Sequence, residues 1–320
     1  MQSGDLIYVA GHTGLIGSAF MRELPRTGYA NLLVRTHAEL ELTDNAAVDA
    51  LFDEHRPRYV IIASGRVGGI MQNQATPASF LAENLAIQLN LLQAAQRVGV
   101  ERLVLFGSSC MYPRECPQPM AESALLTGHP EPTSLSYAIA KLAGVQLCRA
   151  FNQQFGGRRF IPVIPNSAYG PNDDFNPQTG HVLSALLARF HAAVRDNLPE
   201  VTLWGTGTPR REFIHASDIA SAVISLLRQP GLGLDVPINI GSGTDYAIRE
   251  LAEAIARITG FEGRLVWDIS RPDGAPRKLL DSSRLRSIGW EPRVTLEDGL
   301  RETYTWYKSH IVQAEAAGGV

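Results

Sequence analysis

The sequence has 320 residues, of which 45% are hydrophobic and 19% are charged, and its net charge is −3. This composition is ordinary for a globular protein, and the length suffices for one large core or two joined lobes. The small negative charge gives no electrostatic reason to expect nucleic acid or an anionic membrane as the partner.

The cysteines and the hydropathy indicate which kind of compartment suits the protein. The sequence has an odd number of cysteines, and their spacing is not typical of a metal site: Cys110, Cys116 and Cys148. That usage suits a reducing compartment. The N-terminus lacks a basic segment followed by a long apolar run, and no stretch approaches about 18 apolar residues. We therefore expect a cytoplasmic protein with no signal peptide, no membrane span and no metal.

The first element is a buried strand at residues 5–10, which a glycine-rich turn and then a helical pattern to about residue 24 follow at once. Such a turn lets a pyrophosphate approach the backbone and meet free N–H groups at the start of the helix. Its GxxGxxG spacing is a form associated with short-chain dehydrogenases. We expect the whole turn to contact a dinucleotide. It comprises Gly11, His12, Thr13, Gly14, Leu15, Ile16 and Gly17.

The second strand, at residues 31–34, ends in Arg35 and not in an acid. An acidic residue there would hold the ribose 2′-OH of NAD, whereas an arginine accommodates a 2′-phosphate. This favours NADP(H) and leaves NAD(H) open. Further on, Asp44 either contacts the adenine or caps a helix predicted at about residues 45–55.

Strands and helices continue to alternate up to residue 170. Strands are predicted at 59–63, 103–106 and 160–164, with helices at about 78–98 and 134–155. This alternation indicates an α/β fold with a doubly wound parallel sheet, of the Rossmann type. Ligands bind beyond the C-terminal ends of strands in such sheets, and the strand at 103–106 ends beside Ser108.

Tyr137 and Lys141 lie four residues apart on the predicted helix at 134–155, so both side chains lie on one face. An ammonium near a phenol favours the phenolate and lowers the pKa of the phenol. With the hydroxyl of Ser108, this set can exchange a proton with a sugar oxygen. The spacing by itself is also common on ordinary amphipathic helices.

After residue 171 the pattern changes, and most of the remaining elements form a second, smaller α/β lobe, while the helix at about 217–228 is expected to return to the first domain. Helices are predicted at about 181–196, 217–228, 247–259 and 295–311, and strands at 201–204, 237–240 and 264–267. We expect an NADP-binding domain of residues 1–170 plus about 212–236. An interleaved nucleotide-sugar lobe is then formed by about 171–211 and 237–320.

Motifs that carry a family resemblance lie along nearly the whole chain. They occupy residues 11–17, 67–70, 107–113, 118–123, 137–141, 181–182, 188–191, 204–209, 211–215 and 272–281. On these motifs the chain resembles the extended short-chain dehydrogenases and, within them, the GDP-L-fucose synthase group. Members of that group are NADP-dependent oxidoreductases that epimerise GDP-4-keto-6-deoxymannose at C3 and C5 and reduce it at C4.

The resemblance implies five catalytic residues. Tyr137 would protonate O4, Lys141 would tune Tyr137 and hold the nicotinamide ribose, and Ser108 would bond O4. Cys110 and His181 would be the epimerase pair. The chemistry agrees, because a C4 ketone acidifies the protons on C3 and C5, and a thiol and an imidazole suit a base and an acid. Alternatively, Cys110 is a small buried side chain and His181 touches the cofactor.

The resemblance also implies the remaining contacts. Besides the glycine turn, the cofactor would meet Arg35, Asp44, Ala63, Ser64, Asn84, Phe106, Gly107, Tyr137, Lys141, Pro165, Ser167, Ala168 and His181. The GDP-linked 4-keto-6-deoxy sugar would meet Ser109, Arg189, Trp204, Arg211 and Arg271. Family precedent suggests a homodimer through the helices at 78–98 and 134–155.

Several departures from the family pattern surround the sugar and the 2′-phosphate. Ser167 replaces an Asn, Gly180 replaces the Ser before the epimerase His, and His37 replaces a second basic residue. They motivate an alternative, a 4-reductase without epimerase activity on a related GDP sugar such as a 6-deoxy-heptose. A C4-epimerase or dehydratase is disfavoured, because Ser109 and Cys110 stand where dehydratases have an Asp-Glu pair. A non-catalytic dinucleotide-binding protein typically loses Tyr137 or Lys141.

Overall fold

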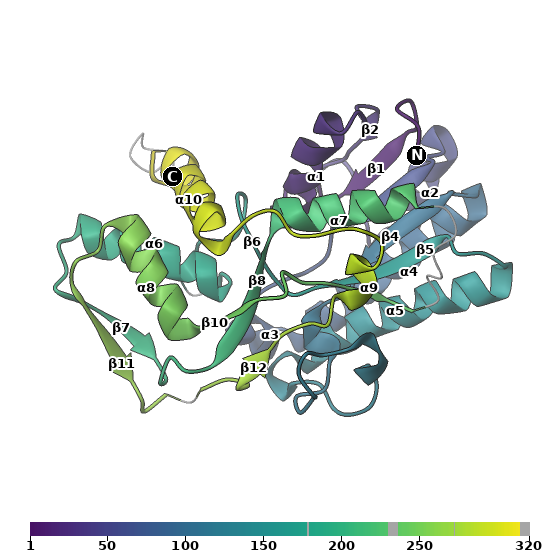
Figure 1. The fold of residues 1–320 in the computed structure, drawn as a ribbon. Helices are drawn as coiled ribbons and strands as arrows, with labels where there is room; N and C mark the ends of the chain where they lie inside the picture. Colours follow the sequence, from purple (N-terminus) through teal and green to yellow (C-terminus); the bar gives the residue numbers. More distant parts are fainter. Residues whose placement is uncertain (178, 230–235, 272, 314–320) are drawn as a thin grey trace.

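The computed structural model describes residues 1–177, 179–229, 236–271 and 273–313, and it has two lobes (Figure 1). A six-stranded sheet forms the centre of the larger lobe, and all of its pairings are parallel. Its strand order is β2-β1-β3-β4-β5-β9. The strands are β1 (Ile7–Ala10), β2 (Leu32–Leu33), β3 (Tyr59–Ile62), β4 (Arg102–Phe106), β5 (Phe160–Pro165) and β9 (Ile238–Ile240). The predicted doubly wound α/β fold is confirmed.

Helices cover both faces of this sheet, because its strands are apolar on both sides. In β1, Ile7 and Val9 face one core, while Tyr8 and Ala10 face the other. The first core is closed by α1 (Leu15–Arg26) and α7 (Ala216–Arg228), so the helix near 217–228 returns to the larger lobe as expected. The second core is closed by α2 (Asn45–His55), α4 (Pro77–Val98) and α5 (Leu135–Phe155).

The strand order reverses between β1 and β3, since β2 lies on one side of β1 and β3 on the other. A crevice opens beyond the C-terminal ends of the strands at such a reversal. The glycine turn at 11–17 follows β1, and the loop at 64–69 follows β3. The topology therefore brings both segments to the place where a dinucleotide binds in folds of this kind.

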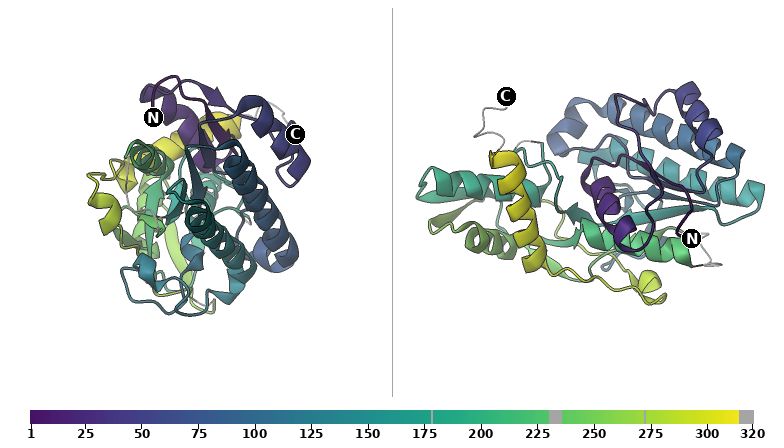
Figure 2. Two further views of the ribbon diagram at one scale, coloured as in Figure 1. Left: turned by 90° about the vertical axis from the view of Figure 1, so that its right-hand side faces the viewer. Right: turned by 90° about the horizontal axis from the view of Figure 1, so that it is seen from above.

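The smaller lobe has its own core between helices and a two-stranded sheet, visible on the left of Figure 1. Its helices are α6 (Val182–Arg195), α8 (Ile248–Thr259) and α10 (Leu296–Tyr307), and its sheet pairs β7 (Glu200–Trp204) with β11 (Arg264–Asp268). Buried side chains of α6, α8 and α10 meet in this core. Examples are Leu187, Ile255 and Leu300. A view from above shows the two lobes side by side along the long axis of the molecule (Figure 2).

A third sheet lies between the lobes, and the sequence analysis missed it. Its central strand is β8 (Arg210–His215), which pairs with β6 (Ser167–Tyr169), β10 (Asp245–Ala247) and β12 (Arg277–Lys278). Two arginines and a glutamate conceal the strand pattern of β8. Glu212 is nevertheless fully buried, and its carboxylate accepts bonds from the backbone N–H groups of Gly243 and Leu280.

One element lies in a different lobe from the one predicted. The sequence analysis assigned residues 237–240 to the smaller lobe, but β9 pairs with β5 and completes the main sheet. Ile238 and Ile240 face the core beneath α7, while Asn239 between them accepts a 2.6 Å hydrogen bond from the Tyr112 hydroxyl. The predicted domain limits otherwise stay a prediction, and residues 230–235 lie outside the described residues.

Short elements complete the described chain. They are α3 (Ile70–Ala75), which was not predicted, α9 (Ser283–Arg286), the 3₁₀ turns η1 (Ser109–Met111), η2 (Glu122–Ala124) and η3 (Pro132–Ser134), and the π-helical turn η4 (Lys308–Val312). No helix in the described part of the chain is both long and apolar enough to cross a membrane.

Candidate active site

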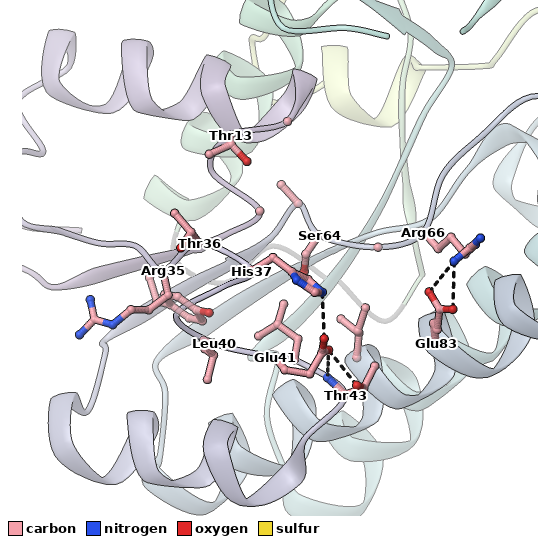
Figure 3. A pocket seen from close by; sticks show the side chains of 17 residues that line it. Thr13, Arg35, Thr36, His37, Leu40, Glu41, Thr43, Ser64, Arg66 and Glu83 are labelled. Atoms are coloured by element: carbon pink, nitrogen blue, oxygen red, sulfur yellow. Dashed lines mark hydrogen bonds and ion pairs between the residues drawn. The ribbon is translucent and has the colours of Figure 1, made fainter. Parts of the chain in front are cut away.

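A cavity of about 660 Å³ opens where β1, β2 and β3 end (Figure 3). Six of the residues expected at the cofactor line it: Gly11, Thr13, Gly14, Arg35, Ala63 and Ser64. They come from three segments that are separate in the sequence. The order of the strands has thus brought together these six residues of the predicted cofactor site.

The walls of this cavity fit a ligand that approaches the backbone closely. Gly11 has a φ of +82°, and a Cβ on it would lie 2.7 Å from the backbone nitrogen of Ser64. A Cβ on Gly17 would lie 2.0 Å from the carbonyl oxygen of Gly11. Nine buried side-chain atoms of the described residues lack a hydrogen-bond partner, and three of them belong to expected cofactor residues, namely His12 Nδ1, Ser64 Oγ and Asn84 Oδ1. A dinucleotide can supply those partners, so the residues present fit this cofactor.

Arg35 lines the cavity, but its guanidinium contacts groups of the protein outside the cavity. Nη1 donates to the carbonyl oxygen of Val34, and Nη2 lies 3.1 Å from His55 Nε2. In Figure 3 the guanidinium points away from Ser64. His37, exposed at the rim, forms a 2.8 Å ion pair with Glu41. A 2′-phosphate would therefore have to draw Arg35 away from its present partners.

Asp44 caps a helix, as one of its two expected roles required. Its carboxylate accepts bonds from the backbone N–H groups of Ala46 and Ala47, at 2.9 and 3.2 Å, and α2 begins at the next residue. Thr43 lines the cavity, but Asp44 is absent from the described residues that do so. The structure thus accounts for Asp44 through capping.

Ser108, Tyr137 and Lys141 come together at the end of β4. The Ser108 hydroxyl lies close enough to the Tyr137 phenol to lower the pKa of the phenol. Lys141, which is 4% exposed, has its ammonium 5.7 Å from the centre of the Tyr137 ring. Phe80 of α4 packs edge-on against the same ring, with centroids 6.2 Å apart. Strand β4 and helix α5 therefore fix the three groups relative to one another, as the spacing predicted.

The electrostatics of this centre differ from the sequence expectation. Burial raises the pKa of Tyr137, and Cys110 raises it further, whereas the nearby Ser108 lowers it. The expected lowering by Lys141 is not found. Burial lowers the pKa of Lys141 itself to about 8. Near neutral pH the phenol thus keeps its proton, which suits a proton donor better than a base.

Cys110 stands beside this centre, whereas His181 belongs to the other lobe. The backbone N–H of Cys110 donates a 3.2 Å bond to Ser108 Oγ. His181 precedes α6 directly, and its Nδ1 lies 3.1 Å from Oδ1 of Asp173. This bond raises the pKa of His181. The two expected epimerase residues are therefore anchored separately, one on each lobe.

The other expected cofactor residues lie around the ends of β4 and β5. Phe106 is the last residue of β4. Gly107 follows it, and a Cβ on Gly107 would lie 2.7 Å from Met111 Cε. Pro165 closes β5, and Ser167 and Ala168 form part of β6. Asn84 is buried and donates from Nδ2 to the carbonyl oxygens of Arg66 and Phe80.

The expected substrate residues divide into an exposed group and a partly buried one. Trp204, 65% exposed, carries the guanidinium of Arg271 at 5.1 Å from its ring centre. Arg189 is exposed on α6. Arg211 donates to the carbonyl oxygen of Arg210, and burial lowers the pKa of Arg211. Pro272, next to Arg271, lies outside the described residues.

Some residues at the site were missed by sequence reasoning. Arg66 and Glu83 both line the cavity and form a 3.0 Å ion pair at one side of it (Figure 3). Ser109 shares a small hollow with Arg277 and Lys278, which come from β12. The basic pair in the motif at 272–281 was the available signal for these. No signal marked Arg66 and Glu83 as partners, because they lie 17 residues apart.

Comparison with known proteins identifies the family of the chain. The model of the "NAD dependent epimerase/dehydratase family" matches residues 7–241. The chain belongs to this family. GDP-L-fucose synthase 1 of Arabidopsis thaliana is 51% identical over 306 residues, which cover 95% of this chain and 94% of the relative. GDP-L-fucose synthase of Escherichia coli (strain K12) is 46% identical over 312 residues, which cover 95% and 97%. The expected resemblance to this group of the family is confirmed.

A solved structure of the family gives a further comparison. A GDP-mannoheptose C4 reductase from Campylobacter jejuni with NADP bound is 37% identical, with a TM-score of 0.87. The match covers 96% of this chain and 99% of that one.

The described residues contain no group of three His, Cys, Asp or Glu side chains that could hold a metal ion.

Proposed function

We propose that the chain is an NADPH-dependent 4-reductase and 3,5-epimerase of a GDP-4-keto-6-deoxy sugar, and that GDP-4-keto-6-deoxymannose is the substrate to test first. The observation that carries this proposal is the set of Ser108, Tyr137 and Lys141 with Cys110 beside it. Its second support is the 46–51% identity to relatives named GDP-L-fucose synthase.

Tyr137 protonates the sugar oxygen in the reductive step. Bound NADPH supplies the hydride that reaches C4, and the phenol delivers a proton to O4 as the carbonyl becomes an alcohol. Ser108 bonds the same oxygen and orients it toward the phenol. The Lys141 ammonium, buried near the Tyr137 ring, holds the nicotinamide ribose in this proposal.

Cys110 and His181 perform the epimerisation before reduction. The ketone at C4 makes the C3 and C5 protons acidic, and negative charge collects on O4 when a base removes one of them. Ser108 and Tyr137 are placed to donate to that oxygen. The Cys110 thiolate removes the proton on one face and keeps it, and the His181 imidazolium donates a different proton on the opposite face, which inverts the carbon.

The cofactor is NADPH in this proposal. Arg35 at the end of β2, where an acid would suit NAD, supports the choice, and so does the NADP-bound C4 reductase among the solved relatives. The nucleotide part of the substrate lies over the smaller lobe, where Trp204 and Arg271 offer an aromatic face and a cation. The larger lobe then serves as the cofactor domain.

The test is one incubation in D₂O. The protein receives enzymatically made GDP-4-keto-6-deoxymannose and NADPH, and the product is analysed by NMR and mass spectrometry. We expect NADPH oxidation and a GDP-fucose product with deuterium at C3 and C5. Without any NADPH oxidation, GDP-4-keto-6-deoxymannose would not be the substrate.

A second candidate function is 4-reduction without epimerisation on a related GDP-4-keto sugar such as a heptose. The C. jejuni heptose reductase supports it, and so does the loop before His181, where a Cβ on Gly180 would lie 2.2 Å from the Asp174 carbonyl oxygen. The same assay separates the two functions. Reduced product without deuterium at C3 and C5 favours this second candidate.

A homodimer is part of the proposal. The helices α4 and α5 expose Leu89, Ile139 and Phe155, which is apolar surface that a second copy can cover. Light scattering of the purified protein should give twice the monomer mass, and charged replacements at Leu89 and Ile139 should reduce it to the monomer. A cytoplasmic location likewise stays a prediction.

A further inference from the structure

Asp173 is a buried carboxylate that the sequence analysis did not single out. Its side chain is 3% exposed, while that of its neighbour His181 is 45% exposed. Asp173 Oδ1 lies 3.1 Å from His181 Nδ1, and Oδ2 accepts a hydrogen bond from the Ser184 hydroxyl. Ser184 is itself fully buried in the first turn of α6. Both oxygens of this carboxylate are thus engaged.

This contact determines which nitrogen of His181 can serve a substrate. A carboxylate accepts only, so Nδ1 carries a hydrogen and donates it to Asp173. Nε2 is then the nitrogen left to exchange a proton. Ser184 holds Asp173 against α6, the helix that His181 directly precedes. The imidazole therefore cannot rotate about its side-chain bonds without breaking its hydrogen bond to Asp173.

We propose that Asp173 is a positioning residue for the epimerase step, which holds His181 in one orientation and keeps it protonated as the acid that returns a proton to the sugar. The proposal rests on the proposed function, since it assigns one half of the epimerase pair. Cys110, on the other lobe, is then the base.

Charged groups around His181 agree with the acid role. The bond to Asp173 raises the pKa of His181, burial lowers it, and the charges of Asp173 and Asp174 raise it further. The imidazolium therefore persists to higher pH than an ordinary histidine allows, about 6.5. Asp174 differs from Asp173 because its Oδ2 accepts a 2.7 Å bond from the Thr179 hydroxyl. It offers a matched control, a carboxylate near His181 that does not bond the imidazole.

The experiment compares D173N, D173E, D174N and S184A. Asparagine keeps the shape of Asp173 and its acceptor toward Nδ1 but loses the charge. We expect D173N to slow C3 and C5 deuterium exchange about 10- to 100-fold, part of the 10²–10⁴ that a positioned acid contributes. As the pH rises, the exchange rate of D173N should begin to fall at a lower pH than that of the wild type. D173E should recover part of the rate, S184A should lose less, and D174N should change least.

Two further readouts separate positioning from mere structural support. NADPH oxidation at C4, followed with an already epimerised keto sugar, should stay within about twofold of wild type in D173N, because Tyr137 makes that step. NMR titration of labelled histidine should show a larger fall in the His181 pKa in D173N than in D174N, because D174N removes a nearby charge but no hydrogen bond to the imidazole. This titration needs no substrate.

Three results would overturn the proposal. They are an unchanged His181 pKa in D173N, an equal loss of exchange and of C4 reduction, and an equal effect of D174N. If D173N fails to fold, D173E and S184A carry the same comparison. Failure of the proposed function is distinguishable, because the wild type would then show neither exchange nor reduction while the His181 titration still differed between D173N and D174N.

Discussion

The two halves of the candidate site are built in different ways. Ser108, Tyr137 and Lys141 are held by β4 and α5, which pack against the main sheet. Trp204 and Arg271 lie exposed at the end of the β7–β11 pair and contact each other. Under the proposed function, Ser108, Tyr137 and Lys141 are thus positioned in advance, whereas the proposed nucleotide contacts Trp204 and Arg271 stay solvated until a ligand covers them. Substitutions should affect rate on the first side and affinity on the second.

The largest effect is expected for Tyr137→Phe. Loss of the phenolic proton should lower kcat for C4 reduction by about 10²–10⁴-fold with little change in KM, because a positioned acid contributes that much. Stopped-flow measurement of NADPH oxidation checks this. Tyr112→Phe is the control, since its buried hydroxyl donates to Asn239 and its loss should cost about 1 kcal/mol of stability without slowing reduction. A normal rate in Tyr137→Phe would remove the proposed proton donor.

Lys141→Met should separate stability from activity. The pKa of Lys141 falls from 10.5 to about 8, so the unfolded chain holds that proton more firmly between those two pH values. The buried charge thus destabilises the fold fully below pH 8, and the cost disappears as the pH rises toward 10.5. We expect Lys141→Met to be more stable at pH 7 by up to about 3 kcal/mol and to reduce about 100-fold more slowly.

Urea unfolding at pH 7 and near pH 10 measures this effect of Lys141. The gain in stability should be nearly full at pH 7 and fall to about a quarter of that value near pH 10. Lys141→Arg is the control, because arginine keeps its charge and should bring no gain. Equal stability changes at both pH values would contradict the assigned cause.

Trp204→Ala examines the recognition side. Removal of an exposed aromatic face should raise KM for the GDP sugar roughly 10-fold and leave kcat and stability nearly unchanged, because base stacking on a ring contributes about 1–3 kcal/mol. Ile269→Ala is the control, since Ile269 is 77% exposed at the end of the same strand pair and belongs to no expected contact. A drop in kcat instead would mean that Trp204 acts on the reacting end.

The smallest effect is expected for Asp44→Ala. Loss of the cap of α2 should lower the free energy of unfolding by about 1 kcal/mol. Affinity for NADPH, measured by nicotinamide fluorescence, should not change, since Asp44 bonds Ala46 and Ala47 and does not line the cavity. Asp44→Ser keeps a capping oxygen and should restore stability. A loss of NADPH affinity would instead assign Asp44 to the adenine.

Local pattern was sufficient for the elements with strong apolar periodicity. The strand at 59–63, the helix at 45–55 and the helix at 134–155 appear within one residue of their predicted limits as β3, α2 and α5. The glycine turn and the Tyr137–Lys141 spacing likewise indicated a cavity at the end of β1 and a buried pair on α5, because both depend on residues close together in the chain.

Tertiary structure alone decided the features that depend on distant partners. Strand β8 forms because Gly243 and Leu280 satisfy the buried Glu212, and β9 joins the main sheet because β5 offers it an open edge. The pKa of Tyr137 rises because burial outweighs the charge that its neighbour was expected to bring. The sequence alone determined which side chains are available and the periodicity of the helices and strands that carry them, while packing decided which partners and how much water each side chain has.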